Sequence, residues 1–343
     1  MAGRFDELTS LIGGNAITFQ TPAGRLAVCP TLTGRLYAEL GGRFLHRIEM
    51  DTIAHPDKPF NNFGGNNLWP APEGGLFAFN YRGDVWCVQP CINAQPYRVT
   101  RLDPDGVVIE KEVLLTNRAG VELRVRMARH ARLTDTPQWL SMFPATRALS
   151  YTVHDSLTVL NDVPATQALI AAWTLEQFDA TPGTVSFGIV EKPQSAINFD
   201  FYAHPGERIV YRRHGFTYRT DGHARGQIGI SVAANARAIG FYDLSCGLLC
   251  LRRNENAGRG TCFNMADNAQ PKGPYSADDA YSIFNSDPDM RAFELETVGG
   301  ADIEQGRLRG SELVSSTTFL QFSDSASIAA FLERNLGPLE GCS

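Results

Sequence analysis

The sequence predicts an all-β protein, built as a large antiparallel β-sandwich with short helices at its two ends. Short runs of alternating apolar and polar residues recur along the chain, which is the pattern of strands that bury one face. Glycine, proline, asparagine and aspartate separate these runs, as turns between strands require. The chain has 343 residues, of which 43% are hydrophobic. We find no repeat or linker and expect a single domain over residues 1–343.

The strand pattern is clear in residues 25–29, 35–40, 107–115, 121–130, 184–189, 227–232, 238–243 and 248–253. In the segment 121–130, apolar residues from Val121 to Met127 share one face and charged residues share the other. Helical periodicity is confined to residues 5–12 and 328–335. The second helix has capping residues at 323–325 and ends before Gly337.

Composition excludes several classes of protein. The formal net charge is −6 and no block of basic residues occurs, so nucleic acid is not an expected partner. No apolar run approaches the ~18 residues that a membrane span needs, so we expect no membrane partner either. The first residues lack the basic and then apolar layout of a signal peptide. We therefore expect the protein in the cytoplasm.

The seven cysteines do not suggest a disulfide framework in a chain of this length. Cys87 and Cys91 have a C-x3-C spacing, and so have Cys246 and Cys250, which raises the question of zinc. Both pairs lie in apolar segments that resemble strands, where such a spacing holds two sulfurs far apart. We expect reduced and mostly buried thiols, with no metal and no cofactor.

The acidic pair Glu294 and Glu296 is the most informative feature of the chain. The two glutamates alternate with Phe293 and Leu295, which predicts a strand with both apolar side chains in the core. Both carboxylates then share the other face, roughly 6.5–7 Å apart. Two like charges on one strand need a proton, a cation, an arginine or a substrate to stabilise them. The alternative is an acidic strand face in solvent.

Two further segments contain candidate substrate-binding residues. In residues 61–75, Trp69 lies near Asn67 and Glu73 within a glycine-rich loop. An indole ring can stack on a pyranose while amides and a carboxylate bind its hydroxyls. The alternative is a rigid turn in which Trp69 anchors the core. Long polar loops of this kind, here residues 51–67 and 254–280, often line sites.

In residues 218–229, His223 is a candidate acid or base, although a surface histidine is the alternative. Arg225 and Gln227 follow it and are candidate substrate-binding residues. The remaining candidates of this kind are Arg82, Trp173 and Asn285. The motifs of serine hydrolases, zincins, P-loop proteins and dinucleotide-binding proteins are absent, which disfavours those four chemistries.

The order of these motifs resembles the galactose-mutarotase-like superfamily, whose β-supersandwich binds carbohydrates in a groove on one sheet. The segment 293–297 is similar to the mutarotase strand that carries the catalytic base, and the resemblance places that base at Glu296. A closer similarity is to an uncharacterised bacterial branch of the superfamily. It rests on residues 64–75, 160–161, 173–178, 221–229, 242–243, 281–287 and 293–297.

The chain also departs from the mutarotase pattern. Mutarotases pair the glutamate with two histidines, but residues 171–178 contain Trp173 and no histidine. A His-Gly-Gly run is replaced here by Phe63, Gly64 and Gly65. The general acid is therefore unassigned, with His223 and His154 as candidates.

Three hypotheses follow, all with a carbohydrate as partner. The first is an aldose 1-epimerase-like isomerase in which Glu296 is the base and Glu294 either tunes its pKa or binds substrate. The second is a carbohydrate-binding or sensor protein without catalysis. The third is a glycoside hydrolase or polysaccharide lyase, although two neighbours on one strand flank a glycosidic bond poorly.

Overall fold

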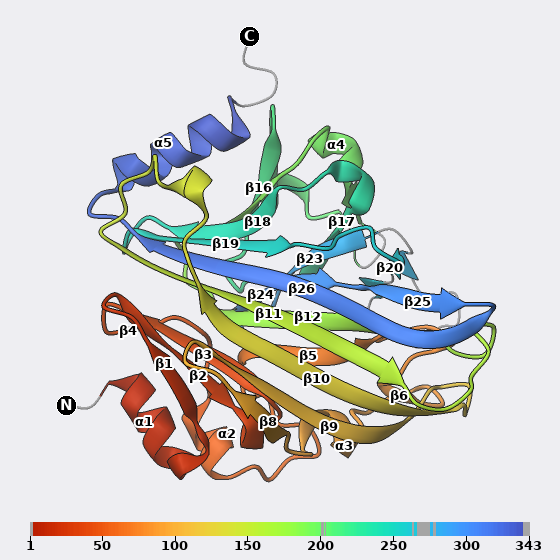
Figure 1. Ribbon diagram of the computed structural model, residues 1–343. Helices are drawn as coiled ribbons and strands as arrows, with labels where there is room; N and C mark the ends of the chain where they lie inside the picture. The colour runs from red at the N-terminus through yellow and green to blue at the C-terminus, as the bar shows by residue number, and fades with distance from the viewer. Residues whose placement is uncertain are drawn as a thin grey trace.

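Two large antiparallel sheets pack face to face, and their strands cross the whole molecule (Figure 1). The computed structural model describes residues 3–199, 202, 204–262, 264–265, 275–276 and 279–338. The inner faces of the two sheets form the main hydrophobic core, which contains residues from Phe19 to Phe319. This arrangement confirms the predicted all-β architecture.

Among the described residues, ten strands form the first sheet. Their spatial order is β1 (Ile17–Gln20), β2 (Gly24–Cys29), β3 (Arg35–Leu40), β5 (Gly65–Ala71), β12 (Ala171–Asp179), β24 (Ala292–Val298), β23 (Asp279–Asn285), β17 (Gly226–Ser231) and β14 (Ile197–Asn198), with β4 (Arg43–Phe44) beside β3. Strands distant in sequence therefore become neighbours, and β24, which contains both glutamates, lies between β12 and β23.

Twelve strands of the described chain form the second sheet. Their order is β15 (Ile209–Arg212), β16 (Gly215–Arg219), β13 (Thr184–Ile189), β18 (Ala238–Asp243), β19 (Leu248–Asn254), β26 (Arg307–Gln321), β11 (Arg147–Val159), β10 (Glu122–Thr134), β9 (Gly106–Thr116) and β8 (Arg98–Leu102), with β25 (Gly300–Glu304) and β20 (Thr261–Cys262) at the side of β26. Two small hairpins are separate from both sheets: β6 (Tyr81–Arg82) with β7 (Val85–Trp86), and β21 (Asn264–Met265) with β22 (Tyr275–Ser276).

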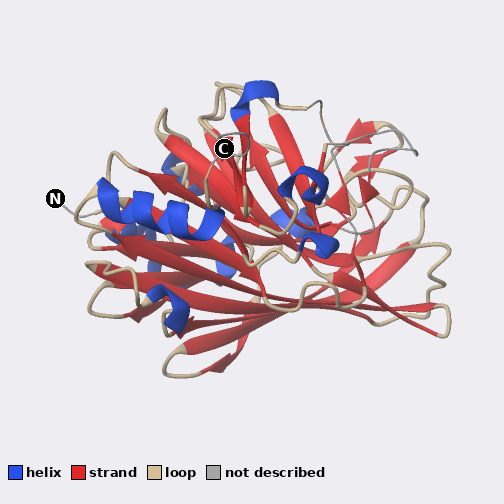
Figure 2. Ribbon diagram, turned by 90° about the horizontal axis from the view of Figure 1, so that it is seen from above, coloured by secondary structure: helices blue, strands red, loops and turns tan. Residues whose placement is uncertain are grey.

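The helices are few and lie outside the sheets (Figure 2). They are α1 (Arg4–Leu11), α2 (Met50–Ala54), α3 (Pro90–Asn93), α4 (Pro193–Ala196) and α5 (Ser325–Leu336). The two predicted terminal helices are confirmed as α1 and α5. Asp324 is the N-cap of α5, because its side chain accepts a hydrogen bond from the backbone N–H of Ser327. No helix in the described ranges is both long and apolar enough to cross a membrane.

The eight strands predicted from alternation are all present, with ends that differ by two residues or fewer in most cases. The main exception is β10, which runs on to Thr134. Its alternation also contains a surprise: Arg129 falls on the buried face, after Leu123, Val125 and Met127. Arg129 is fully buried because it pairs with Asp155 on β11 at 2.7 Å.

Some predicted loops and strands are different in the structure. Residues 51–67 are not one loop, since they contain most of α2 and the start of β5. The glycine-rich segment is largely strand β5, whose entry requires Gly64 and Gly65 at φ of 69° each. A Cβ at Gly64 would lie 2.0 Å from the carbonyl oxygen of Arg47. Most of the predicted loop 254–280 lies outside the described residues.

The cysteines differ from their expected positions. The five cysteines whose side chains are described are all free. Cys29 and Cys250 are buried, while Cys87, Cys91 and Cys246 are half-buried. Cys91 lies on α3 and Cys246 in a turn, so neither C-x3-C pair lies on one strand.

Candidate functional site

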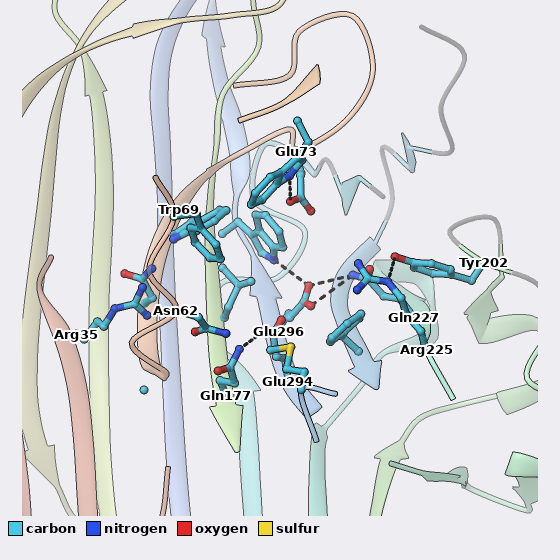
Figure 3. A pocket seen from close by; sticks show the side chains of 18 residues that line it. Arg35, Asn62, Trp69, Glu73, Gln177, Tyr202, Arg225, Gln227, Glu294 and Glu296 are labelled. Carbon is cyan, nitrogen blue, oxygen red and sulfur yellow. Dashed lines mark hydrogen bonds between the residues drawn. The ribbon is translucent and has the colours of Figure 1, made fainter. Parts of the chain in front are cut away.

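A pocket of about 420 Å³ lies on the outer face of the ten-stranded sheet, within the usual size range of small-molecule sites. Its lining residues are Arg35, Phe60, Asn62, Gly65, Asn67, Trp69, Glu73, Trp86, Trp173, Leu175, Gln177, Tyr202, Arg225, Gln227, Phe284, Met290, Glu294 and Glu296. Figure 3 shows Trp69 on one side of Glu296, and Arg225 and Tyr202 on the other.

Strand alternation explains why these side chains meet. On β12, Trp173, Leu175 and Gln177 line the pocket, whereas the alternate residues Thr174 and Glu176 contact the opposite sheet. The register then aligns side chains across neighbouring strands. Gln177 lies opposite Glu294, and Leu175 lies opposite Glu296.

Glu296 is buried on the floor of the pocket, with only 1% of its surface exposed. Its Oε2 accepts hydrogen bonds from Trp173 Nε1 at 2.9 Å, Ser282 Oγ at 2.5 Å and Gln227 Nε2 at 3.2 Å. Three donors from three different strands therefore fix this carboxyl group in one orientation, and together they favour its ionised form.

Glu294 is also buried, although slightly more exposed than Glu296, and it has fewer donors. Its Oε1 accepts a hydrogen bond from Gln177 Nε2 at 2.6 Å. Burial raises the pKa of Glu294, against the effect of its hydrogen bonds with Gln177 and Glu296. Burial also raises the pKa of Glu296 well above its usual range, and the neighbouring charge of Glu294 adds to this rise. Burial and the charge of a close neighbour therefore oppose the simultaneous ionisation of the two carboxyl groups.

One wall of the pocket is aromatic. Trp69 meets Trp173 edge to face at 6.1 Å and Phe60 at 5.8 Å, while Phe60 meets Trp86 at 5.3 Å, all between ring centroids. The hairpin β6–β7 contributes Trp86, whose Nε1 donates to Glu73 at 3.2 Å. This wall presents apolar ring surface beside carboxyl and amide groups, which suits an amphipathic ligand.

Several polar atoms that line the pocket are buried without a hydrogen-bond partner in the described structure. They are Oδ1 of Asn67, Nε1 of Trp69, Oε1 of Gln177 and Nε of Arg35. Buried polar groups are nearly always paired, so these four atoms are exceptions among the described residues.

The structure brings together eight of the residues that the sequence predicted for a site. They are Asn67, Trp69, Glu73, Trp173, Arg225, Gln227, Glu294 and Glu296. The hypothesis of a solvated acidic face on β24 is wrong, because Glu294 is only 7% exposed and Phe293 and Leu295 lie in the core as predicted. Trp69 packs in the core, as one alternative predicted, and it also lines the pocket.

Three predicted site residues do not line the pocket. Arg82, on strand β6, and His223, in the turn before β17, are both exposed, and neither is among the lining residues. Asn285 is buried and holds the turn before β17, where it accepts from the N–H of Gly222 at 2.9 Å and donates to the carbonyl of Ala224 at 2.6 Å. His154 is half exposed on β11, in the other sheet. None of the histidines in the described part of the chain lines the pocket.

Sequence reasoning missed Gln177 and Arg35. Gln177 follows Trp173 by four residues on one strand, so a period of two could have placed it on the same face. Arg35 carried no such signal. It is buried because it donates to the carbonyl of Gly64 at 2.6 Å and to Asn93 Oδ1 at 3.0 Å. Burial lowers the pKa of Arg35 to about 10, so it stays charged at neutral pH.

A search of the described residues for three or more histidine, cysteine or acidic side chains that could bind one metal ion finds no such group. The lining residues of the pocket offer two buried carboxyl groups, amide and indole N–H donors, and two arginines.

Solved structures with a similar fold share little sequence with this chain. A candidate aldose 1-epimerase from Escherichia coli K12 has a TM-score of 0.52 at 15% identity, with 89% of this chain and 98% of that chain covered. A galactose mutarotase-like protein from Lactobacillus casei has a TM-score of 0.50 at 12% identity, covering 89% and 99%. A candidate aldose 1-epimerase from Klebsiella pneumoniae has a TM-score of 0.50 at 12% identity, covering 95% and 85%.

These similarities show that the fold is galactose mutarotase-like, as the order of motifs predicted. No curated protein matches the sequence. A family model matches residues 16–303, which include most strands of both sheets and every residue that lines the pocket. The chain therefore belongs to a family of unknown function (DUF6786).

Proposed function

We propose that this protein binds a carbohydrate in the pocket and catalyses an aldose 1-epimerase-like proton transfer on it, with Glu296 as the base. The observation that supports this most is the buried pair of Glu294 and Glu296 beneath an aromatic wall. A pair of carboxyl groups with one proton can both accept and donate a proton near neutral pH, which anomer interconversion requires.

The lining of the pocket matches the chemistry of a sugar. Trp69, Trp86 and Trp173 offer ring faces and edges to the C–H face of a pyranose. The side-chain amides of Asn67 and Gln177 line the pocket and are groups of the kind that bind hydroxyl groups. Structural neighbours described as aldose 1-epimerases or mutarotase-like proteins support the same class of ligand.

The donors around Glu296 suit the role of a base. They support its ionised form and leave one oxygen less occupied, since Oε1 has only a 3.4 Å contact with Gln227 Nε2. This carboxylate can accept the proton from the C1 hydroxyl as the ring opens, and it can return the proton when the ring closes on the other face.

The test is the interconversion of sugar anomers, measured by polarimetry or by NMR exchange over a panel of aldoses. We expect the wild type to accelerate interconversion of at least one sugar. The variant Glu296→Gln should lower kcat by about 10²–10⁴-fold, the usual contribution of a general base. Equal rates for the wild type and this variant would exclude the proposal. The variant Glu304→Gln, at an exposed side chain on β25, is the matched control.

A second candidate is a carbohydrate-binding protein without turnover. It is supported by the absence of a histidine among the lining residues, given the histidine pair of mutarotases. It predicts saturable binding of a sugar by calorimetry in both the wild type and Glu296→Gln, with no change in any rate. Analysis of products from glycosides and oligosaccharides in the same panel tests the third candidate, a hydrolase or lyase.

A further inference from the structure

We propose that the carbohydrate bound by this protein is a neutral oligosaccharide, with one sugar unit in the pocket around Glu296, the first pocket, and the next unit in a second pocket that continues it. This inference rests on the proposed function and names its substrate class. The second pocket has a volume of about 570 Å³ and lies where β12 ends and β24 begins. Its lining includes Arg47, Glu49, Asp179, Asp289, Met290 and Arg291.

The face of β12 that lines the first pocket continues into the second pocket. Trp173 and Gln177 line the first pocket, and Asp179, two residues beyond Gln177 on the same face, lines the second. Gln177 and Glu294 lie at the end of the first pocket opposite Glu73 (Figure 3). At the usual rise per residue of a strand, Trp173 and Asp179 are about 20 Å apart. A ligand that extends along β12 past Gln177 therefore enters the second pocket.

The two pockets share a wall, and the second pocket is anchored to the sheet. Met290 lines both pockets, and the flexible side chain of a methionine can adapt to a ligand that passes it. The backbone N–H of Arg47 donates to the carbonyl oxygen of Gln177 at 2.9 Å. The backbone N–H of Ala180 donates to the carbonyl oxygen of Arg291 at 2.9 Å. Arg47 and Arg291 therefore flank the end of β12 in fixed positions.

The charges that line the two pockets favour a neutral saccharide over a phosphorylated one. Among the described residues, three carboxyl groups and two arginines line each pocket. In the second pocket, Arg47 forms ion pairs with Glu49 and, at 3.5 Å, with Asp179. A phosphate group would meet more carboxyl groups than arginines, and their like charges would repel it. A sugar hydroxyl can donate to a carboxylate and accept from a guanidinium, so it suits both kinds of side chain.

The two pockets offer different surfaces to a ligand. The first pocket has an aromatic wall that includes Trp69 and Trp86, on which a sugar ring can stack. No aromatic side chain of the described chain lines the second pocket. One sugar unit therefore stacks in the first pocket, while hydrogen bonds hold the next unit in the second. A net gain of one or two hydrogen bonds corresponds to a roughly tenfold lower Kd.

The experiment measures binding to the full chain by calorimetry. The probes are glucose and galactose, the disaccharides maltose, cellobiose and lactose, and glucose 6-phosphate. We expect at least one disaccharide to bind about tenfold more tightly than either monosaccharide. We expect glucose 6-phosphate to bind no more tightly than glucose, because the carboxyl groups of both pockets oppose its charge.

The variant Arg291→Gly tests the second pocket alone, since Arg291 lines that pocket and not the first. Arg291 has a φ of 49°, which glycine adopts without strain, so the loop should keep its conformation. We expect its affinity for the preferred disaccharide to fall by about three- to tenfold, with monosaccharide affinity unchanged within about twofold. The matched control is Gln305→Gly, at an exposed position outside both pockets with a φ of 50°. Its affinities should equal those of the wild type.

Three results would show that the second pocket does not bind a sugar unit, while the proposed function stands. In the first, the wild type binds monosaccharides and disaccharides equally. In the second, Arg291→Gly keeps the disaccharide affinity or lowers both affinities by the same factor. In the third, glucose 6-phosphate binds more tightly than every disaccharide. If the wild type binds no sugar of the panel, the proposed function fails and this inference fails with it.

Discussion

Glu176 on β12 and the pair of Glu294 and Glu296 on the adjacent strand β24 are all buried, but they lie on opposite faces of one sheet. Glu176 faces the second sheet. It accepts hydrogen bonds from His46 at 2.8 Å and from Thr317 at 2.7 Å, and it contacts both Tyr151 and Arg252. Among the described residues, each carboxyl group of the outer pair has fewer donors than Glu176, three for Glu296 and one for Glu294, and both groups line the pocket.

The different partners of these glutamates shift their pKa values in opposite directions. Burial alone would raise the pKa of Glu176, but Arg252, His46 and Tyr151 together hold it at about 2. Burial raises the pKa of Glu294 and Glu296, and no arginine contacts them closely enough to reverse the effect. The inner carboxylate is therefore a fixed charge that stabilises the packing of the two sheets. The raised pKa values of the outer pair instead favour a neutral form of its carboxyl groups, as is common where carboxyl groups act in a site.

The largest expected loss of stability follows a substitution of Glu176, on the face of the sheet that packs in the core. Glu176→Gln should lower the free energy of unfolding by about 3–5 kcal/mol, because it leaves the fully buried Arg252 without a counter-charge. Chemical denaturation near pH 7 measures this loss. Glu304→Gln, which breaks an exposed ion pair with Arg309, should change stability little. Similar effects of the two variants would show that the inner network does not stabilise the fold.

The next effect separates hydrogen bonding from charge in the same network. Tyr151→Phe removes one O–H donor to the Glu176 carboxylate, at an expected cost of about 1.5–3 kcal/mol. The double variant with Glu176→Gln should lose less than the sum of the two single losses, because both remove one interaction. Additive losses would show that Tyr151 acts through packing alone.

A substitution in the outer pair should change the free energy of unfolding in the opposite direction. Glu294→Gln removes a buried charge from the pocket and should raise the free energy of unfolding on the order of 1 kcal/mol at pH 8. Because the folded pKa is raised, the pair stabilises the fold while it is protonated, at low pH, and this contribution is lost as pH rises. The gain in Tm should therefore shrink towards pH 4. A gain that is equal at both pH values would contradict the raised pKa values.

The contribution of Glu176 to stability depends on pH in the opposite direction. Its folded pKa is depressed, so its contribution is present above the unfolded pKa near 4.5 and is lost as the pH falls towards 2. Unfolding curves of the wild type and Glu176→Gln should therefore converge in acid, whereas those of the wild type and Glu294→Gln should diverge above neutral pH. The two pH profiles together test whether the two faces differ as the structure indicates.

The directions of the side chains on β24 could be predicted from the sequence, but the partners of Glu176 could not. Alternation placed Phe293 and Leu295 inside and Glu294 and Glu296 outside, because a period of two is a local property of a strand. The partners of Glu176 come from β11, β19 and β26 and from the segment before α2, and no local pattern links them. Arg129 did carry a signal, since it interrupts the apolar face of β10.

In the pocket, too, the residues on strands followed the sequence pattern more closely than those near turns. Gln227 and Trp173 lie on strands and line the pocket, because the strand face determines the direction of their side chains. His223 and Arg82 were misplaced because their direction depends on turn geometry, which composition alone does not determine. Whether the chain forms one domain, and where in the cell it works, stay predictions.

The smallest effect concerns a carboxylate that belongs to neither face. Asp324 is exposed, and its Oδ1 accepts from the backbone N–H of Ser327 at 2.8 Å, an interaction that lowers the pKa of Asp324. Asp324→Ala should lower Tm by less than either inner-face variant, while Asp324→Asn should keep Tm close to the wild type, since asparagine caps helices as well. A loss in Asp324→Ala as large as that in Glu176→Gln would mean that burial is not what separates these carboxylates, and the contrast between the two faces would need another cause.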